Sequence, residues 1–364
     1  MSALFEPITL RSLTIPNRIW LSPMCMYSAA AEGPEIGVAT DFHLAHLGAR
    51  AAGGAGLVMV EATAVRPEGR ISPYDLGLWN DRQQEGLARV AALIRQHGSA
   101  PGIQLGHAGR KASNDRPRAG GAGLSAEQGG WETVGPSALA FSADRPAPHE
   151  LTVDQIQDVV RAFADAAKRA LAAGFQVAEV HGAHGYLIHQ FLSPFSNHRT
   201  DGYGGSFAGR ARLALEVVAA VRAVWPEELP LVFRVSATDW LDGRPGWTPE
   251  ETVRLAKELQ AIGVDLFDVS SGGNVPDARI PLGPGYQVPF AAQVRQGSGA
   301  ATGAVGLITD PAQAEEIVAS GQADVVLLGR ELLRNPYWPL HAARELGAER
   351  RWPEQYDYVV GQRG

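Results

Sequence analysis

Eight short apolar runs alternate with amphipathic stretches along this chain, and no other feature constrains its fold as much. The runs lie at residues 19–21, 57–60, 102–105, 177–180, 231–235, 266–269, 301–305 and 325–328. Strands this apolar are typical of parallel sheets that helices cover on the outside. We therefore expect an α/β fold, a (β/α)₈ TIM barrel, and keep an open doubly wound sheet as the alternative.

The stretches between the runs have helical periodicity. Apolar residues recur at intervals of three and four, for instance at Leu87, Val90, Ala91 and Ile94, which indicates amphipathic helices. Thr152 and Thr248 stand where two such helices would begin, and Gly174 and Gly263 where they would end. Strands and helices therefore alternate as a barrel requires.

One connection is much longer than the others. Residues 108–150, after the third run, are too many for an ordinary loop and are rich in Gly, Pro, Ala and Ser. We expect them to cross the barrel mouth as a lid. The predicted organisation is one TIM-barrel domain over residues 1–364, with a lid inserted after strand 3 at 108–150 and a C-terminal tail at 347–364, possibly placed at a subunit interface.

Charge and composition narrow the possible partners. The formal net charge of −7 argues against nucleic acid or an anionic membrane surface. Cys25 is the single cysteine, and the N-terminus has no basic segment followed by an apolar core. The apolar runs are too short to cross a bilayer. We expect a cytoplasmic protein without disulfides.

The residues after the fourth run carry the strongest chemical signal. His181, His184 and Tyr186 follow an apolar strand, and TIM barrels gather their functional groups at strand carboxyl ends. Two imidazoles supply hydrogen-bond donors for a developing oxyanion, and the phenol supplies a proton. This set suits reduction of a polarised double bond better than hydrolysis.

The same histidines also have a metal-like spacing. His181-x-x-His184, with His189 nearby, resembles zinc-binding sequences. No carboxylate or cysteine follows at a ligand-like position, so we expect no metal. A metal-dependent hydrolase stays an alternative at this stage.

Three further residues allow two interpretations each. Cys25, after the first run, is either a buried small residue or a thiol aimed into the mouth. Gln104, inside the third run, is satisfied either by a neighbouring strand or by a planar polar ligand. Arg234, inside the fifth run, needs an anion, either Glu179 or a ligand that becomes anionic, such as a reduced flavin.

Two glycine-containing loops suggest a phosphate site. Gly303 and Gly306 follow the seventh run, and Gly329 and Arg330 follow the eighth. Backbone N–H groups in these two loops bind phosphate in many TIM barrels, although glycines that serve tight turns are an alternative. No G-x-G-x-x-G or P-loop sequence occurs, so a Rossmann site is not supported. A barrel that only binds a phosphorylated metabolite is a third possible class.

Taken together, the sequence resembles the old yellow enzymes, flavin-dependent ene-reductases, and in particular their thermophilic-like bacterial subclass. The resemblance extends along almost the whole chain: Leu4 to Pro7, Asn17 to Ile19, Ser22 to Tyr27, Val60 to Val65, Gly102 to Lys111, Pro136 to Ala138, His181 to Leu187, Ser193-Pro194, Asn197 to Asp201, Tyr203 to Ser206, Ala301 to Gly306 and Gly329-Arg330.

The resemblance implies an NADPH dehydrogenase or ene-reductase with a tightly bound, non-covalent FMN at the barrel mouth. NADPH or NADH would reduce the flavin transiently. An activated alkene, such as an α,β-unsaturated carbonyl compound, a maleimide or a nitroalkene, would then reoxidise it in a ping-pong cycle, by hydride transfer from flavin N5 to Cβ and protonation at Cα.

The resemblance also assigns roles residue by residue. Tyr186 would deliver the proton, His181 and His184 would bind the substrate oxygen, and Tyr27 would be a further substrate contact. The cofactor-binding residues would be Ser22, Pro23, Met24 and Cys25 near N5 and O4, Ala62 and Gln104 at the pyrimidine, Arg234 at N1 and O2, and Gly303, Gly306, Gly329 and Arg330 on the phosphate side.

Two segments depart from the family pattern. Gly209-Arg210 stands where relatives usually read Asn-Arg, and we expect only a local change in helix capping. In the subclass the tail often passes an arginine or aromatic residue into a neighbouring active site; this tail reads Gln355-Tyr356-Asp357-Tyr358 and has its arginine displaced to Arg363. We expect a homo-oligomer, a dimer or tetramer.

Overall fold

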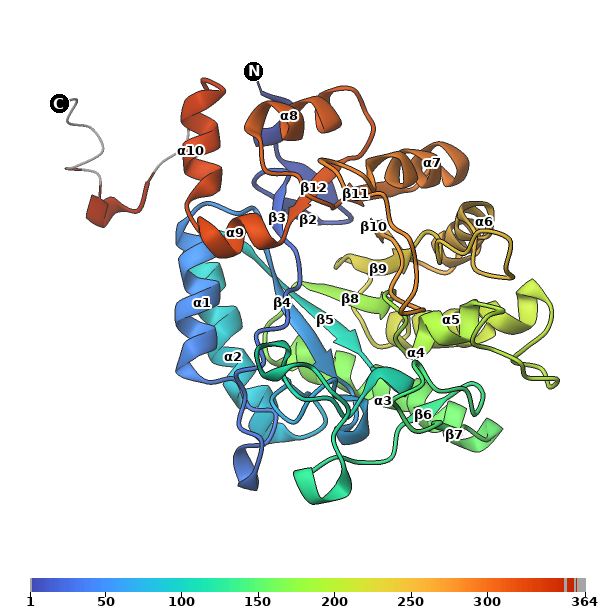
Figure 1. Cartoon of the computed structure of the whole chain (residues 1–364). Helices are drawn as coiled ribbons and strands as arrows, with labels where there is room; N and C mark the ends of the chain where they lie inside the picture. The colour runs from blue at the N-terminus through green and yellow to red at the C-terminus, as the bar shows by residue number, and fades with distance from the viewer. Residues whose placement is uncertain (1, 350–351, 357, 359–364) are drawn as a thin grey trace.

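A closed barrel of eight parallel strands forms the centre of the molecule (Figure 1). The computed structural model describes residues 2–349, 352–356 and 358. The barrel strands are β3 (Ile19–Leu21), β4 (Leu57–Ala64), β5 (Ala100–Gly106), β8 (Val177–Gly182), β9 (Leu231–Ser236), β10 (Leu266–Ser270), β11 (Ala301–Ala304) and β12 (Val325–Leu328). Each falls on a predicted run. The TIM-barrel prediction is confirmed, and the open-sheet alternative is wrong.

Several strands continue beyond the apolar run that predicted them. β4 extends through Glu61 to Ala64, and β8 through His181 to Gly182. These extensions carry buried polar side chains, which an apolar pattern does not recognise as strand. The strand ends missed by the sequence pattern are thus the ends that approach the barrel mouth.

Helices surround the barrel. They are α1 (Asp41–Ala52), α2 (Asp81–Gln96), α3 (Val153–Ala172), α4 (Leu187–Leu192), α5 (Phe207–Arg222), α6 (Pro249–Ala261), α7 (Val288–Ser298), α8 (Pro311–Ala319), α9 (Arg330–Arg334) and α10 (Trp338–Glu345). Thr152 and Thr248 cap α3 and α6, their side chains accepting hydrogen bonds from Gln155 N and Glu251 N. The predicted helix starts are therefore confirmed.

The segment at the start of α5 contains the departure from the family pattern. Ser206 is the N-cap, and its hydroxyl accepts a hydrogen bond from Gly209 N at 3.2 Å. A Cβ at position 209 would lie 2.2 Å from the carbonyl oxygen of Gly204, so only glycine fits this backbone. Arg210 is buried and donates to the carbonyl oxygen of Leu192.

The barrel interior changes character from one end to the other. Its amino-terminal end is apolar, with Trp20, Leu57 and Val232 in one buried cluster. The hairpin of β1 (Ile8–Leu10) and β2 (Leu13–Ile15) packs into the same cluster and closes this end. Its carboxyl-terminal part holds the buried polar side chains Gln104, Glu179, Arg234 and Asp268. Such side chains need partners, which points to function at that end.

The long connection between β5 and α3 is tied to loops at the carboxyl ends of the strands. Asn114 N donates to the carbonyl oxygen of Ile71 at 2.8 Å, and Trp131 Nε1 to that of Glu68 at 2.9 Å. Short elements break up this connection: the 3-10 turns Gly109–Lys111, Pro117–Ala119 and Ala126–Gln128, and the two-residue strands β6 (Val134–Gly135) and β7 (His149–Glu150). These contacts fit the cover expected at residues 108–150.

The 3-10 turn Glu354–Tyr356 follows α10 and lies apart from it, to the left in Figure 1. Tyr337 of the turn before α10 stacks on Trp352 with ring centres 5.7 Å apart, and Tyr358 is exposed. Asp357 and residues 359–364, including Arg363, lie outside the described residues, so the expected role of the tail stays a prediction. No helix in the described part of the chain has the length and apolarity to cross a membrane.

Candidate active site

The turn that follows β8 places the three residues with the strongest sequence signal. His181 is in the strand, His184 and Gly185 have left-handed backbone conformations with φ of 58° and 71°, and Tyr186 caps α4. A Cβ at Gly185 would lie 2.2 Å from the carbonyl oxygen of Gly273. Glycine is therefore required at this position, because the turn packs closely against the loop that contains Gly273.

Buried polar groups hold this turn. Gly185 N donates to His189 Nδ1 at 2.8 Å, and the other ring nitrogen, Nε2, lies 2.9 Å from Asp239 Oδ1. His189 and Asp239 are fully buried. Lys111 Nζ donates to the carbonyl oxygen of His184 at 2.8 Å. His189 thus supports the turn from behind instead of joining His181 and His184.

The three side chains lie edge to face. The ring centre of His181 is 5.2 Å from that of His184 and 5.0 Å from that of Tyr186. Burial, and then the charge of Arg234, lower the pKa of both imidazoles well below 6.5. Burial raises the pKa of the Tyr186 phenol well above 10. At neutral pH the imidazoles are therefore uncharged and the phenol keeps its proton.

Hydrogen bonds limit the tautomers of the two imidazoles. His181 Nδ1 accepts from Ala183 N at 3.3 Å, which leaves the proton on Nε2. His184 Nε2 lies 2.7 Å from Ser270 Oγ. The Ser270 hydroxyl is also within hydrogen-bond distance of Gln287 Oε1, at 3.2 Å, and its single proton can go to only one of these two acceptors. The His184 proton is on Nδ1, as a donor, in the arrangement in which Ser270 donates to Nε2. No group of three or more His, Cys, Asp or Glu side chains within residues 2–349, 352–356 and 358 is arranged to hold a metal ion.

The segment after β3 lies against the same site. Cys25 and Tyr27 pack with Tyr186, Ile71 and Trp131 in an apolar cluster at the barrel mouth. The Cys25 side chain is half-buried, and burial, followed by the charges of two nearby carboxylates, raises the pKa of its thiol. The Cys25 thiol is therefore protonated, and its place beside the cofactor stays a prediction.

A buried carboxylate fixes this segment. Glu61, on β4, accepts a hydrogen bond from Met26 N and lies 3.3 Å from His43 Nε2. The sequence analysis did not single out Glu61. Its position directly after an apolar run was the available signal, because a charged residue in that register faces the barrel interior.

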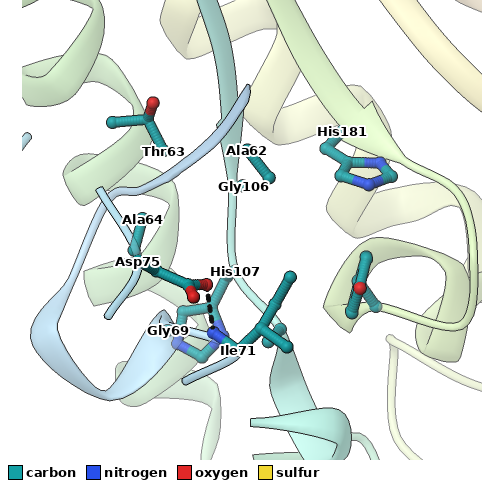
Figure 2. A pocket seen from close by; sticks show the side chains of 11 residues that line it. Ala62, Thr63, Ala64, Gly69, Ile71, Asp75, Gly106, His107 and His181 are labelled. Carbon is teal, nitrogen blue, oxygen red and sulfur yellow. Dashed lines mark hydrogen bonds between the residues drawn. The ribbon is translucent and has the colours of Figure 1, made fainter. Parts of the chain in front are cut away.

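A small pocket separates β4 from the His181 turn (Figure 2). Figure 2 shows Ala62 and His181 on its walls, with Asp75 and His107 near its far side. Tyr186 also lines it. Asp75 accepts from Ile71 N at 2.7 Å, and burial raises the pKa of its carboxyl to about 7. Ala62 thus lines the same pocket as His181, and its contact with the flavin pyrimidine stays a prediction.

A larger cavity of about 170 Å³ lies between the loops after β11 and β12. Six predicted cofactor residues line it: Ser22, Met24, Arg234, Gly306, Gly329 and Arg330. Ser270, Tyr286, Gln287 and Arg334 also line it and were not predicted. Gly303 lies lower, among barrel-interior side chains such as Leu266 and Leu327, and does not line the cavity.

The chemistry of this cavity favours an anion next to a polar planar group. Gly306 has φ of 122°, and a Cβ there would lie 2.9 Å from Gln287 Nε2, so the backbone is left bare. Arg330 and Arg334 supply positive charge at one end, and Arg234 supplies it at the other. Bare backbone N–H groups and guanidinium groups are the donors that phosphate prefers.

Arg234 corrects one expectation from the sequence. The carboxylate in contact with it is Asp268, whose Oδ2 lies 3.1 Å from Arg234 Nε, and not Glu179. Glu179 instead accepts a hydrogen bond from Gln104 Nε2 at 2.6 Å. Gln104 is thus satisfied by a neighbouring strand, one of its two interpretations. Asp268 was missed because its pairing depends on strand register.

Comparison with known proteins agrees with this geometry. Residues 3–349 match the model of the NADH:flavin oxidoreductase / NADH oxidase family. The chain belongs to this family, that of the old yellow enzymes. It is 49% identical to an NADPH dehydrogenase of Listeria monocytogenes serovar 1/2a over 98% of each chain. It is 50% identical to an NADPH dehydrogenase of Geobacillus thermodenitrificans, again over 98% of each.

Solved structures of the same family superpose well. Morphinone reductase has a TM-score of 0.79 at 29% identity and covers 97% of this chain and 92% of its own. An old yellow enzyme homologue from Zymomonas mobilis has a TM-score of 0.77 at 25% identity, covering 95% and 94%. The protein is thus an NAD(P)H-dependent flavin oxidoreductase of the old yellow enzyme type, and the family and enzyme class expected from the sequence are confirmed.

Proposed function

We propose that the protein reduces activated C=C bonds with a tightly bound FMN and with NADPH or NADH as transient reductant. The substrates are α,β-unsaturated carbonyl compounds, maleimides and nitroalkenes. The observation that carries the proposal is the contact between two uncharged imidazoles, His181 and His184, and the protonated phenol of Tyr186. Relatives at 49 and 50% identity bear the name NADPH dehydrogenase.

The residues present fit FMN. A cavity with bare backbone at Gly306 and guanidinium groups at Arg330 and Arg334 suits its phosphate. Arg234 and Ser22 line the same cavity, and Arg234 Nη2 donates to Ser22 Oγ at 3.2 Å, so a charged donor faces the place expected for the ring. When bound, the flavin supplies hydride transfer between the nicotinamide and the alkene.

The imidazoles bind and polarise the substrate. His181 and His184 would each donate a hydrogen bond to the carbonyl or nitro oxygen, which makes Cβ electrophilic because charge develops on that oxygen. Uncharged imidazoles suit this task, since each can donate a hydrogen bond to the substrate oxygen without transferring its proton. The Ser270 hydroxyl lies 2.7 Å from His184 Nε2 and so orients the imidazole ring, with Nδ1 as the proposed donor to the substrate.

Tyr186 holds the proton for Cα. Its phenol lies beside His181 and packs, partly buried with Cys25 and Tyr27, against an apolar cluster. A protonated phenol within reach of Cα would complete the reduction as general acid. Tyr27, in the same cluster, would contact the substrate from the opposite segment.

Three further predictions belong to this proposal. We infer a homo-oligomer, a dimer or tetramer, whose tail approaches a neighbouring site, and size-exclusion chromatography with light scattering tests it; a monomer at working concentration contradicts it. Nucleic acid and membrane are not partners, in keeping with the net charge of −7. A chain with a single cysteine suits a reducing cytoplasm.

Colour and its bleaching test the function directly. The purified protein should be yellow, should bleach with NADPH under nitrogen, and should regain its colour with a maleimide or a cyclic enone. A colourless protein, or a yellow one that no activated alkene reoxidises, contradicts the proposal. Activity lost on treatment with a chelator would favour a metal-dependent hydrolase instead.

The anion site has a separate test. Phenols give oxidised old yellow enzymes a long-wavelength absorbance, and the double variant His181→Ala, His184→Ala should lose it because both proposed donors are gone. The flavin spectrum without phenol serves as the control for folding and occupancy. A phenol that still titrates normally would show that the imidazoles do not form the anion site.

A further inference from the structure

Four polar side chains form one layer inside the barrel, below the carboxyl end. Gln104 of β5 pairs in register with Glu179 of β8, and Arg234 of β9 pairs in register with Asp268 of β10. These four are on successive strands, and none is more than 5% exposed. We call Gln104, Glu179, Arg234 and Asp268 the polar layer.

The polar layer contains two carboxyl groups and one guanidinium. Arg234 Nε lies 3.1 Å from Asp268 Oδ2, and Gln104 Nε2 donates to Glu179 Oε1 at 2.6 Å. Glu179 Oε2 and both carboxylate oxygens of Asp268 are buried without a hydrogen-bond partner within the described residues, so the two carboxyl groups differ in the guanidinium that lies beside Asp268 alone. Two like charges away from water are costly, and one base compensates only one of them. One of the two carboxyl groups therefore holds a proton.

The contacts of Glu179 and Asp268 show which of the two carboxyl groups holds the proton. Burial raises the pKa of Asp268 as well, but the guanidinium of Arg234 in contact with it lowers that pKa and compensates its anionic form. Glu179 has only the amide of Gln104 beside it, and burial and the charge of Asp268 raise its pKa to about 8. The other groups that act on this carboxyl, Arg234 and Gln104, lower its pKa. His181, two residues further on the same strand, is uncharged at neutral pH.

We propose that Glu179 stays protonated at neutral pH and that Asp268 alone balances Arg234, so that these two carboxyl groups set the reduction potential of the bound flavin. The second part rests on the proposed function. Hydride transfer from the nicotinamide brings two electrons and one proton to the flavin, so no proton is taken from Glu179. The reduced flavin would carry an additional negative charge next to Arg234, and the guanidinium attracts this charge. The negative charge of Asp268 weakens the attraction, whereas a neutral Glu179 does not weaken it.

The first part can be tested without catalysis. The variant Glu179→Gln replaces a neutral carboxyl by a neutral amide of the same shape. A carboxyl whose pKa is raised in the folded state loses stability as the pH rises from the unfolded value of about 4 to the folded value. Wild type should therefore become less stable relative to Glu179→Gln between about pH 4 and pH 8, measured by urea unfolding of the purified protein.

The control for this measurement is Thr302→Val. Thr302 is fully buried on β11, its hydroxyl has no hydrogen-bond partner within the described residues, and it lies outside the polar layer. Its effect should not change with pH. If Glu179→Gln is instead less stable than wild type at pH 8, Glu179 is an ion-paired carboxylate, and the proposal is wrong.

The second part is tested by the midpoint potential of the flavin at pH 7. Asp268→Asn is made in the Glu179→Gln background, so that Glu179 cannot ionise in its place. This double variant should favour the reduced flavin by about tenfold or more, about 30 mV for a two-electron couple, because Arg234 is then uncompensated. Glu179→Gln alone and Thr302→Val should leave the potential unchanged. A rise in Glu179→Gln, or no rise in the folded double variant relative to Glu179→Gln, overturns the assignment. Should no flavin bind at all, the proposed function fails while the unfolding test stays valid.

Discussion

The two sides of the barrel mouth are built in different ways. On the β8 side, the turn from Ala183 to Tyr186 is held by buried contacts, among them the bond from Gly185 N to His189 at 2.8 Å and the contact of His189 with Asp239 at 2.9 Å. On the β11 and β12 side, a cavity of about 170 Å³ is bordered by glycine backbone and by the exposed Arg330.

The two sides therefore have different tasks: the β8 side positions a group that transfers a proton, and the β11 and β12 side attracts a phosphate. A group that transfers a proton must be held within a fraction of an ångström, which requires rigid neighbours that have their own partners. A phosphate is attracted by charge and by bare N–H groups, which tolerate some freedom. Substitutions on the two sides should therefore affect different measurements, the rate of the chemical step on one side and cofactor affinity on the other.

The largest effect is expected at Tyr186. Tyr186→Phe removes the proton but keeps the ring against His181, so alkene reduction should fall by about 10² to 10⁴, the range for a positioned acid. Flavin reduction by NADPH should be largely retained. Anaerobic stopped-flow measurement of the two half-reactions separates them. An unchanged oxidative half-reaction would remove Tyr186 from this role.

A large effect on stability is expected behind the turn. Asp239→Asn weakens a fully buried contact with the His189 imidazole and should lower the free energy of unfolding by roughly 1.5–3 kcal/mol, the range for a hydrogen bond to a charged group. Burial raises the pKa of Asp239, but His189 and hydrogen bonds outweigh it and lower the pKa below its usual value, so this contribution is present above about pH 4 and is lost as the pH falls below it.

Urea unfolding measures this change, and the chain offers a matched control. Asp165→Asn breaks an exposed ion pair with Lys168 on α3 and should cost well under about 1 kcal/mol. If the two variants are equally stable, the buried pair does not hold the turn, and the contrast between the two sides of the mouth weakens.

The fold could be predicted almost completely from the sequence. The eight apolar runs mark all eight barrel strands. Strands buried on both faces are apolar at successive positions, so each one is recognised as a continuous apolar run. The strand ends were predicted less well. β8 continues through His181 because the barrel interior turns polar toward its carboxyl end, and there a polar residue is no longer a sign of a loop.

The site could be predicted as a set of residues but not as a set of contacts. His181, His184 and Tyr186 do lie together, as their spacing and the family resemblance indicated. Glu179 was the wrong prediction for the carboxylate partner of Arg234. The partner is Asp268, which is brought to Arg234 by the register of β9 with β10. Long-range register follows from closure of the whole barrel, and no local pattern contains it.

A smaller effect is expected on the cavity side. Arg330→Ala should weaken FMN binding by roughly 10- to 100-fold, the usual value of a lost charge-assisted hydrogen bond. Alkene reduction at saturating FMN should stay near the wild-type rate. Arg334→Ala is the control, since that guanidinium is already paired with Glu331 at 2.6 Å and should contribute less. No loss in Arg330→Ala would show that the phosphate does not depend on Arg330, and a larger loss in Arg334→Ala would assign the phosphate contact to Arg334 instead.

The smallest effect is expected from a change of pH on the rate of alkene reduction, and a rate that stays nearly constant supports the proposed protonation states. Burial lowers the pKa of His181 and His184 well below 6.5 and raises that of Tyr186 well above 10. Between about pH 7 and pH 9 none of these three groups changes its charge, so the rate constant of the oxidative half-reaction should change by much less than tenfold per pH unit, because both donors and the acid keep their protons. Lys111 and Asp75, with pKa values of about 7, and Glu179, with a pKa of about 8, titrate nearby and add only small indirect changes. Stopped-flow mixing of reduced enzyme with a cyclic enone across this range measures it. A rate that falls tenfold per pH unit within the range would mean that a proposed donor or acid titrates there, and that the β8 side is less shielded from water than its buried contacts require.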